Sequence, residues 1–237
     1  MICDSHTHID LNDLDFFKKE NIAISACAME PSSAALLLDA TKDINNIFVS
    51  CAIHPMNSDK YSIDEITPYL EKVNIIGEIG MDSTWCDVDI KIQEDIFIKQ
   101  LNIAQSLNKA IIVHTKGEER RISEILKNYS MDKIIHWYSS PYYLNSYIDL
   151  DSYFTVGPSI LDHDDSVINL VKNVDISRLM IESDGIDAIN WALGKKYPIE
   201  ETPKVLDLML EKIASIKGLS KMCVEKAVEK NFFIFNK

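Results

Sequence analysis

Two histidines near the amino terminus have the type and spacing of metal ligands. His6 and His8 lie two residues apart where the apolar run that begins at Ile2 ends. Side chains on a strand alternate between its two faces, so both imidazoles would point the same way and could reach one metal ion. An isolated pair of this kind is often a coincidence. Its meaning depends on which other ligand-type residues the chain places beside it.

Four further residues of the same chemical kind stand in or directly after apolar runs. Glu78 lies between two glycines inside one run, and a buried carboxylate without a partner is costly, so it needs a cation or a strong hydrogen-bond network. His114 and His136 each close an isoleucine-rich run, and Asp184 follows another. Six such residues at the ends of runs are hard to assign to packing alone. We therefore expect a metal site.

The apolar runs themselves predict eight strands. Each is short, rich in isoleucine or valine, and nearly continuous rather than alternating, as expected of parallel strands that are covered on both faces. Polar stretches with helical periodicity separate the runs. The predicted strands lie near residues 2–6, 22–28, 47–53, 75–79, 110–114, 133–137, 153–157 and 179–182.

Several of the intervening stretches carry the marks of helices. An apolar stripe at helical spacing runs through the stretch around Leu101. Thr202, with a proline directly after it, predicts the capped start of a helix, and Gly218 predicts its end. Residues 220–230 predict one more helix, whereas residues 185–198 are expected to form a long loop.

This order of elements predicts an α/β fold with a single (β/α)8 barrel. Eight strands alternating with helices fit a TIM-like barrel, which commonly needs about 250 residues. We expect residues 1–237 to form one such domain, with the metal site at the carboxyl ends of the strands, where barrels build their active sites. An open, doubly wound sheet is the alternative architecture.

Composition narrows the choice of partners. The formal net charge of −13 disfavours a broad nucleic-acid-binding surface, because such a surface repels the phosphate backbone. A nucleic-acid or small-molecule phosphoester substrate stays possible if bound cations reverse the local field. The five cysteines show no CxxC pair, which fits a reducing, cytoplasmic location. No apolar run approaches a membrane span, no signal peptide is visible, and the oligomeric state is left open.

The six ligand-type residues suffice for two divalent metal ions. Imidazole and carboxylate ligands suit Zn²⁺ or Mn²⁺ better than Mg²⁺. Such ions lower the pKa of a bound water toward neutrality, and Asp184 is the best candidate for orienting that water and accepting its proton. One ion would be held by His6, His8 and Asp184 and the other by His114 and His136, with Glu78 bridging them.

Ordered motifs along nearly the whole chain resemble the TatD-type metal-dependent hydrolases of the amidohydrolase superfamily. The resemblance implies a TIM-like barrel, divalent metals, the six ligands named above, and hydrolysis, typically of phosphodiester bonds in DNA. The motifs that carry it are Asp4-Ser5-His6-Thr7-His8, Ile53-His54-Pro55, Gly77-Glu78-Ile79-Gly80-Met81-Asp82, Val113-His114-Thr115-Lys116, Ile135-His136 and Glu182-Ser183-Asp184.

Two segments depart from the family pattern. After His136 the family usually has a small, glycine-containing loop, whereas this chain continues with Trp137 and Tyr138. After its last metal-site aspartate the family commonly has Ala-Pro and then an arginine that can meet phosphate. Here Gly185 follows, and the segment as far as Trp191 contains no arginine. The usual substrate-holding residues are therefore altered.

Other residues beside the expected site have less certain roles. His54 resembles a family position that is not a metal ligand, so we expect it to contact substrate, the alternative being a hydrogen bond that fixes its loop. Lys116 could hold an anion or be solvated. Trp137, Tyr138 and Trp191 could form an aromatic wall against a flat group or simply pack their loops.

Two acidic side chains near the expected site have supporting roles. We expect Asp82 to order its loop or to support a ligand from outside. Glu182 could serve in the same way or close an internal salt bridge.

Three functions are compatible with these features. The leading hypothesis is a metal-dependent hydrolase that acts on ester bonds, as a phosphodiesterase or deoxyribonuclease of TatD type. The alternative keeps the site but makes the enzyme an amide, lactone or other acyl hydrolase, since the arginine is missing and the net charge is acidic. A non-catalytic barrel that binds a metal or another ligand is the third.

Overall fold

A computed structural model, which describes residues 1–20 and 22–236, contains one sheet of eight parallel strands. The strands pair in chain order, each with the next, so the order reversal of a doubly wound sheet is absent from the described residues and the barrel prediction is confirmed. The strands are β1 Ile2–Thr7, β2 Ile22–Ala28, β3 Ile47–Cys51, β4 Ile75–Asp82, β5 Ala110–Lys116, β6 Lys133–Ile135, β7 Tyr153–Val156 and β8 Leu179–Ile181.

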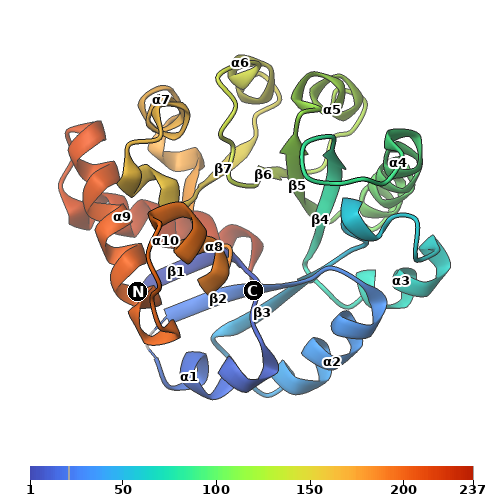
Figure 1. The fold of residues 1–237 in the computed structure, drawn as a ribbon, viewed down its shortest axis with the longest axis horizontal. Helices are drawn as coiled ribbons and strands as arrows, with labels where there is room; N and C mark the ends of the chain where they lie inside the picture. Colours follow the sequence, from blue (N-terminus) through green and yellow to red (C-terminus); the bar gives the residue numbers. More distant parts are fainter. Residues whose placement is uncertain (21, 237) are drawn as a thin grey trace.

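Helices surround the strands (Figure 1). Their inner faces pack on the isoleucine-rich outer faces of the strands, which leaves the described strands almost wholly buried. Within the described residues, no helix combines the length and apolarity that crossing a membrane requires. The helices are α1 Leu14–Lys19, α2 Pro31–Thr41, α3 Ile63–Leu70, α4 Ile90–Ser106, α5 Glu119–Leu126, α6 Leu144–Ile148, α7 Asp165–Asn173, α8 Ile186–Leu193, α9 Thr202–Lys217 and α10 Lys221–Phe235.

The barrel is joined between β8 and β1 by hydrogen bonds just beyond the end of β8. The Asp184 backbone N–H donates to the His6 carbonyl oxygen at 3.1 Å. The Ser183 backbone N–H and hydroxyl donate to the two Asp4 carboxyl oxygens at 2.9 and 2.5 Å. Burial raises the pKa of this Asp4 carboxyl to about 7, although the Ser183 hydrogen bonds act in the opposite direction. The same contacts place two candidate ligands, His6 and Asp184, side by side.

Helix α10 covers the amino-terminal end of the barrel, opposite the carboxyl ends of the strands. The Phe235 side chain packs into a buried cluster at the start of the strands with Ile112 and Ile134, and its ring centroid lies 4.8 Å from that of Tyr153. This burial explains why the helix runs to Phe235, past the residue 230 expected from the sequence. The other end of the barrel is left for the candidate site.

Two register irregularities bracket candidate ligands. The pairing of β1 with β2 shifts between Asp4 and Thr7, around His6, and the pairing of β4 with β5 shifts between Ile76 and Ile79, around Glu78. Such irregularities change the direction of a side chain and are frequent beside active sites. In β4 the close approach also requires glycine, because a Cβ on Gly80, whose φ is +152°, would lie 2.1 Å from the His114 carbonyl oxygen.

Two local predictions were wrong. Glu201 rather than Thr202 occupies the position before α9, because a short 3-10 turn over Ile199–Glu201 runs directly into the helix and Thr202 becomes its buried first residue. The segment expected to be a loop contains α8, which packs against the neighbouring turn at Pro158–Asp162 and buries Ile189. The end of α9 at Gly218, with φ of +65°, is confirmed.

We predict that Ser183→Ala lowers the free energy of unfolding by about 1–3 kcal/mol, because it removes the hydroxyl that donates to the buried Asp4 carboxyl. Urea denaturation of the metal-free protein measures the change. The control is Ser152→Ala, since the Ser152 hydroxyl is buried without a hydrogen-bond partner. Equal losses in the two variants would contradict a special role for the β8–β1 junction.

Candidate metal centre

The Glu78 carboxylate is the centre of the site, because its two oxygens face two different pairs of histidines. Oε2 lies 3.3 Å from His6 Nε2 and 3.6 Å from His8 Nε2. Oε1 lies 2.5 Å from His114 Nδ1 and 3.5 Å from His136 Nε2. Strands β1, β4 and β5 and the residue after β6 thus bring the four histidines to one buried carboxylate.

Asp184 completes the same arrangement from the end of β8. Its Oδ1 lies 3.4 Å from the Nε2 atoms of both His6 and His8, and its Oδ2 lies 3.8 Å from His136 Nε2. The residue has a left-handed backbone with φ of +57°, and such strain in a residue other than glycine is concentrated at functional sites. All six residues predicted as ligands from the sequence therefore lie together.

The donor atoms fit a divalent cation. Ligand atoms about 2.0–2.1 Å from a tetrahedral Zn²⁺ are roughly 3.3–3.4 Å from one another, and the spacings around His6, His8 and Asp184 are 3.3 to 3.6 Å. The buried His6 Nε2 and Asp184 Oδ1 have no hydrogen-bond partner. Buried polar atoms without partners are rare in proteins, and a cation between them would satisfy both.

Hydrogen bonds from outside the cluster determine which nitrogen three of the four candidate-ligand histidines present to it. His136 Nδ1 lies 3.0 Å from the Glu182 carboxylate and His8 Nδ1 lies 3.2 Å from the Cys27 carbonyl oxygen, so Nε2 faces the cluster in both rings. In His114 the Nε2 atom lies 2.9 Å from the Asp82 carboxylate, so Nδ1 is the nitrogen that faces Glu78. Carboxylate or carbonyl partners of this kind orient metal-bound histidines in many proteins.

In His54 the Nδ1 atom is paired with a backbone N–H rather than with a carboxylate or carbonyl oxygen. Its Nδ1 accepts a hydrogen bond from the Met56 backbone N–H at 3.2 Å, so the neutral ring carries its proton on Nε2. Burial lowers the pKa of this imidazole, which favours the neutral form. Nε2 lies 3.8 Å from Glu78 Oε2 and is therefore a donor directed at the site. These contacts distinguish His54 from the four candidate-ligand histidines.

Opposite charges hold the ionisable groups of the metal-free cluster in their charged forms. Burial would raise the pKa of Glu78, but His136 and His114 hold it well below its usual range. Burial would likewise raise the pKa of Asp184, and His136 and His6 lower it. Burial would lower the pKa of His114, but the Glu78 and Asp82 carboxylates raise it to about 9. A cation that binds here must displace protons from the imidazoles.

Cys27, to which the sequence assigned no role in the site, also borders it. Its thiol is buried, donates to the Gly77 carbonyl oxygen at 3.3 Å, and lies in one group of possible metal-binding atoms with His6, His8 and Glu78. Burial raises its pKa to about 11, so the thiol keeps its proton at neutral pH. The sequence signal for a place beside the site was the position of Cys27 near the end of β2, which neighbours β1.

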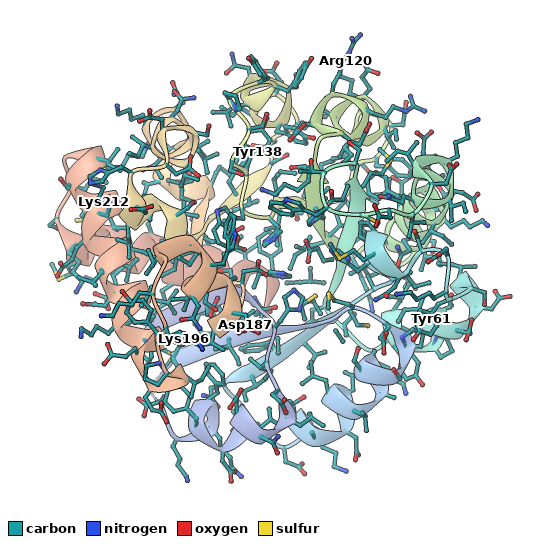
Figure 2. All side chains as sticks on the ribbon, in the orientation of Figure 1. Tyr61, Arg120, Tyr138, Asp187, Lys196 and Lys212 are labelled. Carbon is teal, nitrogen blue, oxygen red and sulfur yellow. The ribbon has the colours of Figure 1, made fainter. Side chains whose placement is uncertain are left out.

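A cavity of about 480 Å³ opens above the cluster and has an aromatic lining. Trp137 and Trp191 line it, which favours the aromatic-wall alternative for these two residues, and Trp85 joins them although nothing in the sequence indicated it. Tyr138 does not take part. It is buried against Tyr147 and Phe154, on the inner side of α6 (Figure 2).

Lys116 lines the cavity at the end of β5. Its ammonium donates to the Ser139 hydroxyl at 2.7 Å and lies 5.0 Å from the centre of the Trp85 ring. Burial lowers its pKa. Both contacts hold the ammonium beside the cavity rather than free in solvent.

Comparison with known proteins identifies the family. The family model for TatD-related DNases matches residues 3–236. The chain belongs to this family. As a TatD-family protein it is a metal-dependent hydrolase, which agrees with the six clustered side chains at the carboxyl ends of the barrel strands.

Individual relatives agree with this assignment. An uncharacterized metal-dependent hydrolase of Methanocaldococcus jannaschii is 29% identical over 242 residues, which cover 96% of this chain and 94% of that protein. The human deoxyribonuclease TATDN3 is 24% identical, with coverage of 96% and 90%. The crystal structure of the TatD homologue YjjV from Escherichia coli has a similar fold, with a TM-score of 0.85, 18% identity and coverage of 99% and 97%.

We predict that Zn²⁺ or Mn²⁺ raises the unfolding temperature of the chelator-treated TatD-family protein. An ion that binds only the folded chain stabilises that chain by about 2.7 kcal/mol when the free ion concentration is 100 times its Kd. Because protons compete for His114, the rise should grow as the pH increases toward about 9. Differential scanning calorimetry measures it, with potassium chloride of matched ionic strength as the control. An unchanged unfolding temperature would contradict a metal centre.

Proposed function

We propose that this TatD-family protein is a phosphodiesterase of the deoxyribonuclease type that uses two divalent ions, Zn²⁺ or Mn²⁺. The observation that carries the proposal is the Glu78 carboxylate, whose two oxygens each face a separate pair of imidazoles. Two-metal sites of this kind stabilise both the attacking and the leaving oxygen of a phosphoryl displacement. The name of the human relative, deoxyribonuclease TATDN3, favours the same substrate class.

The proposed ligands follow from the geometry of the donor atoms. The ions supply an acidified water as nucleophile and positive charge for the phosphate oxygens. Glu78 would bridge, with its position held by its burial in β4. One ion would be held by His6, His8 and Asp184, and the other by His114 and His136.

The chain's own side chains then have distinct tasks around the reacting phosphate. Asp184 is the one candidate ligand besides His8 that is partly open to the cavity, so it is placed to orient the attacking water and accept its proton. His54 Nε2–H is directed to donate to a phosphate oxygen. Lys116 adds a positive charge at the wall of the same cavity. These two residues therefore replace part of what an arginine would do.

An acyl hydrolase is the second candidate. The segment between Asp184 and Trp191 lacks the arginine common in the family, and the cavity wall is rich in indole rings. An amide or lactone carbonyl could be polarised at the same ions. A panel of phosphoryl and acyl substrates, assayed with one metal at a time, separates the two candidates.

The five cysteines are free thiols, which supports the expected cytoplasmic, reducing location.

We predict that Asp184→Asn lowers kcat on a generic phosphodiester, such as bis(p-nitrophenyl) phosphate, by at least about 100-fold, because the amide cannot accept the proton of the water. The control is Asp187→Asn, an exposed carboxylate three residues away on α8 (Figure 2). It should leave the rate unchanged.

Two results would overturn this reading of the site. Full activity of Asp184→Asn would exclude Asp184 as the proton acceptor. An absence of phosphodiester cleavage with Zn²⁺, Mn²⁺ and Mg²⁺, combined with cleavage of an acyl substrate, would replace the proposed function by its alternative.

We predict that Glu182→Gln weakens metal binding by about 10- to 100-fold, because the amide holds the His136 ring and its tautomer less firmly than the carboxylate does. Competition with a fluorescent chelator measures the two metal affinities separately. The weaker binding should be confined to one ion. Glu200→Gln, on an exposed side chain, is the matched control, and an unchanged affinity in Glu182→Gln would contradict the orienting role.

A further inference from the structure

We propose that Trp85, Trp137 and Trp191 form a subsite that stacks one nucleobase of the substrate next to the metal centre. The inference rests on the proposed function and specifies its substrate as a nucleotide unit recognised by its ring. These are the three tryptophans of the whole chain, and all of them line the cavity that also contains His8, Glu78 and Asp184.

Two of these rings are largely exposed to solvent. Trp191 on α8 is 68% exposed and Trp85, just after β4, is 53% exposed. A tryptophan can bury about 150–250 Å² of surface, so leaving two of them open at the mouth of a cavity forgoes substantial stabilisation. A ligand with a flat apolar face would cover them.

The rings are held in place before any ligand binds. Trp191 makes edge-to-face contacts with Trp85 at 6.0 Å and with Trp137 at 6.1 Å between ring centroids. Trp137 is fixed below them, because its indole N–H donates to the Ser159 hydroxyl at 3.0 Å and its ring lies directly over Gly157. An edge-to-face pair covers only one face of one ring, so the remaining ring faces stay available for stacking.

The positions of the charges match a nucleotide rather than another flat molecule. The Lys116 ammonium lies 5.0 Å from the centre of the Trp85 ring, and the candidate metal ligands Glu78 and Asp184 line the same cavity. A phosphate held between the metal centre and Lys116 would leave its base beside the indoles. A volume of about 480 Å³ accommodates a single nucleotide unit.

Stacking also accounts for the missing arginine and the net charge. Base–aromatic stacking contributes about 1–3 kcal/mol per base and tolerates every base. A chain with a net charge of −13 gains little from long-range attraction to phosphate. Affinity that comes from the indole rings depends less on salt than affinity from arginine contacts does.

The test measures binding separately from hydrolysis. Metal-loaded protein is titrated with thymidine 5′-monophosphate and with 2-deoxyribose 5-phosphate, which lacks the base. Because every tryptophan lies in the subsite, quenching of the intrinsic fluorescence reports the nucleotide directly, and calorimetry gives both dissociation constants. We expect the base to tighten binding by roughly 5-fold or more.

Tryptophan variants test whether the indole rings provide this gain in affinity. Trp191→Ala should weaken binding of thymidine 5′-monophosphate by roughly 5-fold or more and leave that of 2-deoxyribose 5-phosphate unchanged. Trp191→Phe should retain most of the gain. Tyr142→Ala, which removes a 69% exposed ring that does not line the cavity, should affect neither ligand.

The outcomes separate the subsite from the proposed function. Equal affinities of the wild type for the two phosphates, or equal weakening of both by Trp191→Ala, would overturn the subsite even in an active phosphodiesterase. Base-dependent binding that Trp191→Ala removes would support the subsite even if no phosphodiester were cleaved, and only the proposed function would then fail.

Discussion

The site depends on one buried carboxylate with imidazoles on both sides. Glu78 is 2% exposed, and its two oxygens lie within 2.5–3.6 Å of nitrogens from four histidines. Removing such a charge from water is strongly unfavourable unless compensating charge surrounds it. The barrel supplies this compensation, because parallel strands in cyclic order bring residues that are far apart in the sequence to one edge.

Much of the surrounding structure helps to bring the histidines and Glu78 together. The irregular pairing of β1 and β4 directs His6 and Glu78, and the contacts of Ser183 with Asp4 keep the end of β8 against β1. Burial of Phe235 closes the opposite end of the barrel. The Glu182 and Asp82 carboxylates then orient two of the imidazoles from outside. Fold and site are therefore specified by the same residues.

The sequence was sufficient for the fold and for which residues gather, because both follow from periodicity. Apolar runs ended by His6, His114 and His136 predict strand ends, and strand ends in a barrel share one face. It was not sufficient for contacts that depend on side-chain direction. For Tyr138 the sequence left a place at the cavity and loop packing both open, and the side chain packs into the core. Trp85 was overlooked because its loop has no periodicity. The tautomer of His54 depends on a backbone N–H two residues away, which spacing alone does not reveal.

The proposed function requires that Glu78 bridge two metal ions within one cluster. Anomalous diffraction from crystals grown with Mn²⁺ or Zn²⁺, combined with metal analysis of the same protein, tests this most directly. The account predicts two anomalous peaks, one on each side of the Glu78 carboxylate, with His6 and His8 at one peak and His114 and His136 at the other. A single peak, or two ions that do not share Glu78, would contradict it.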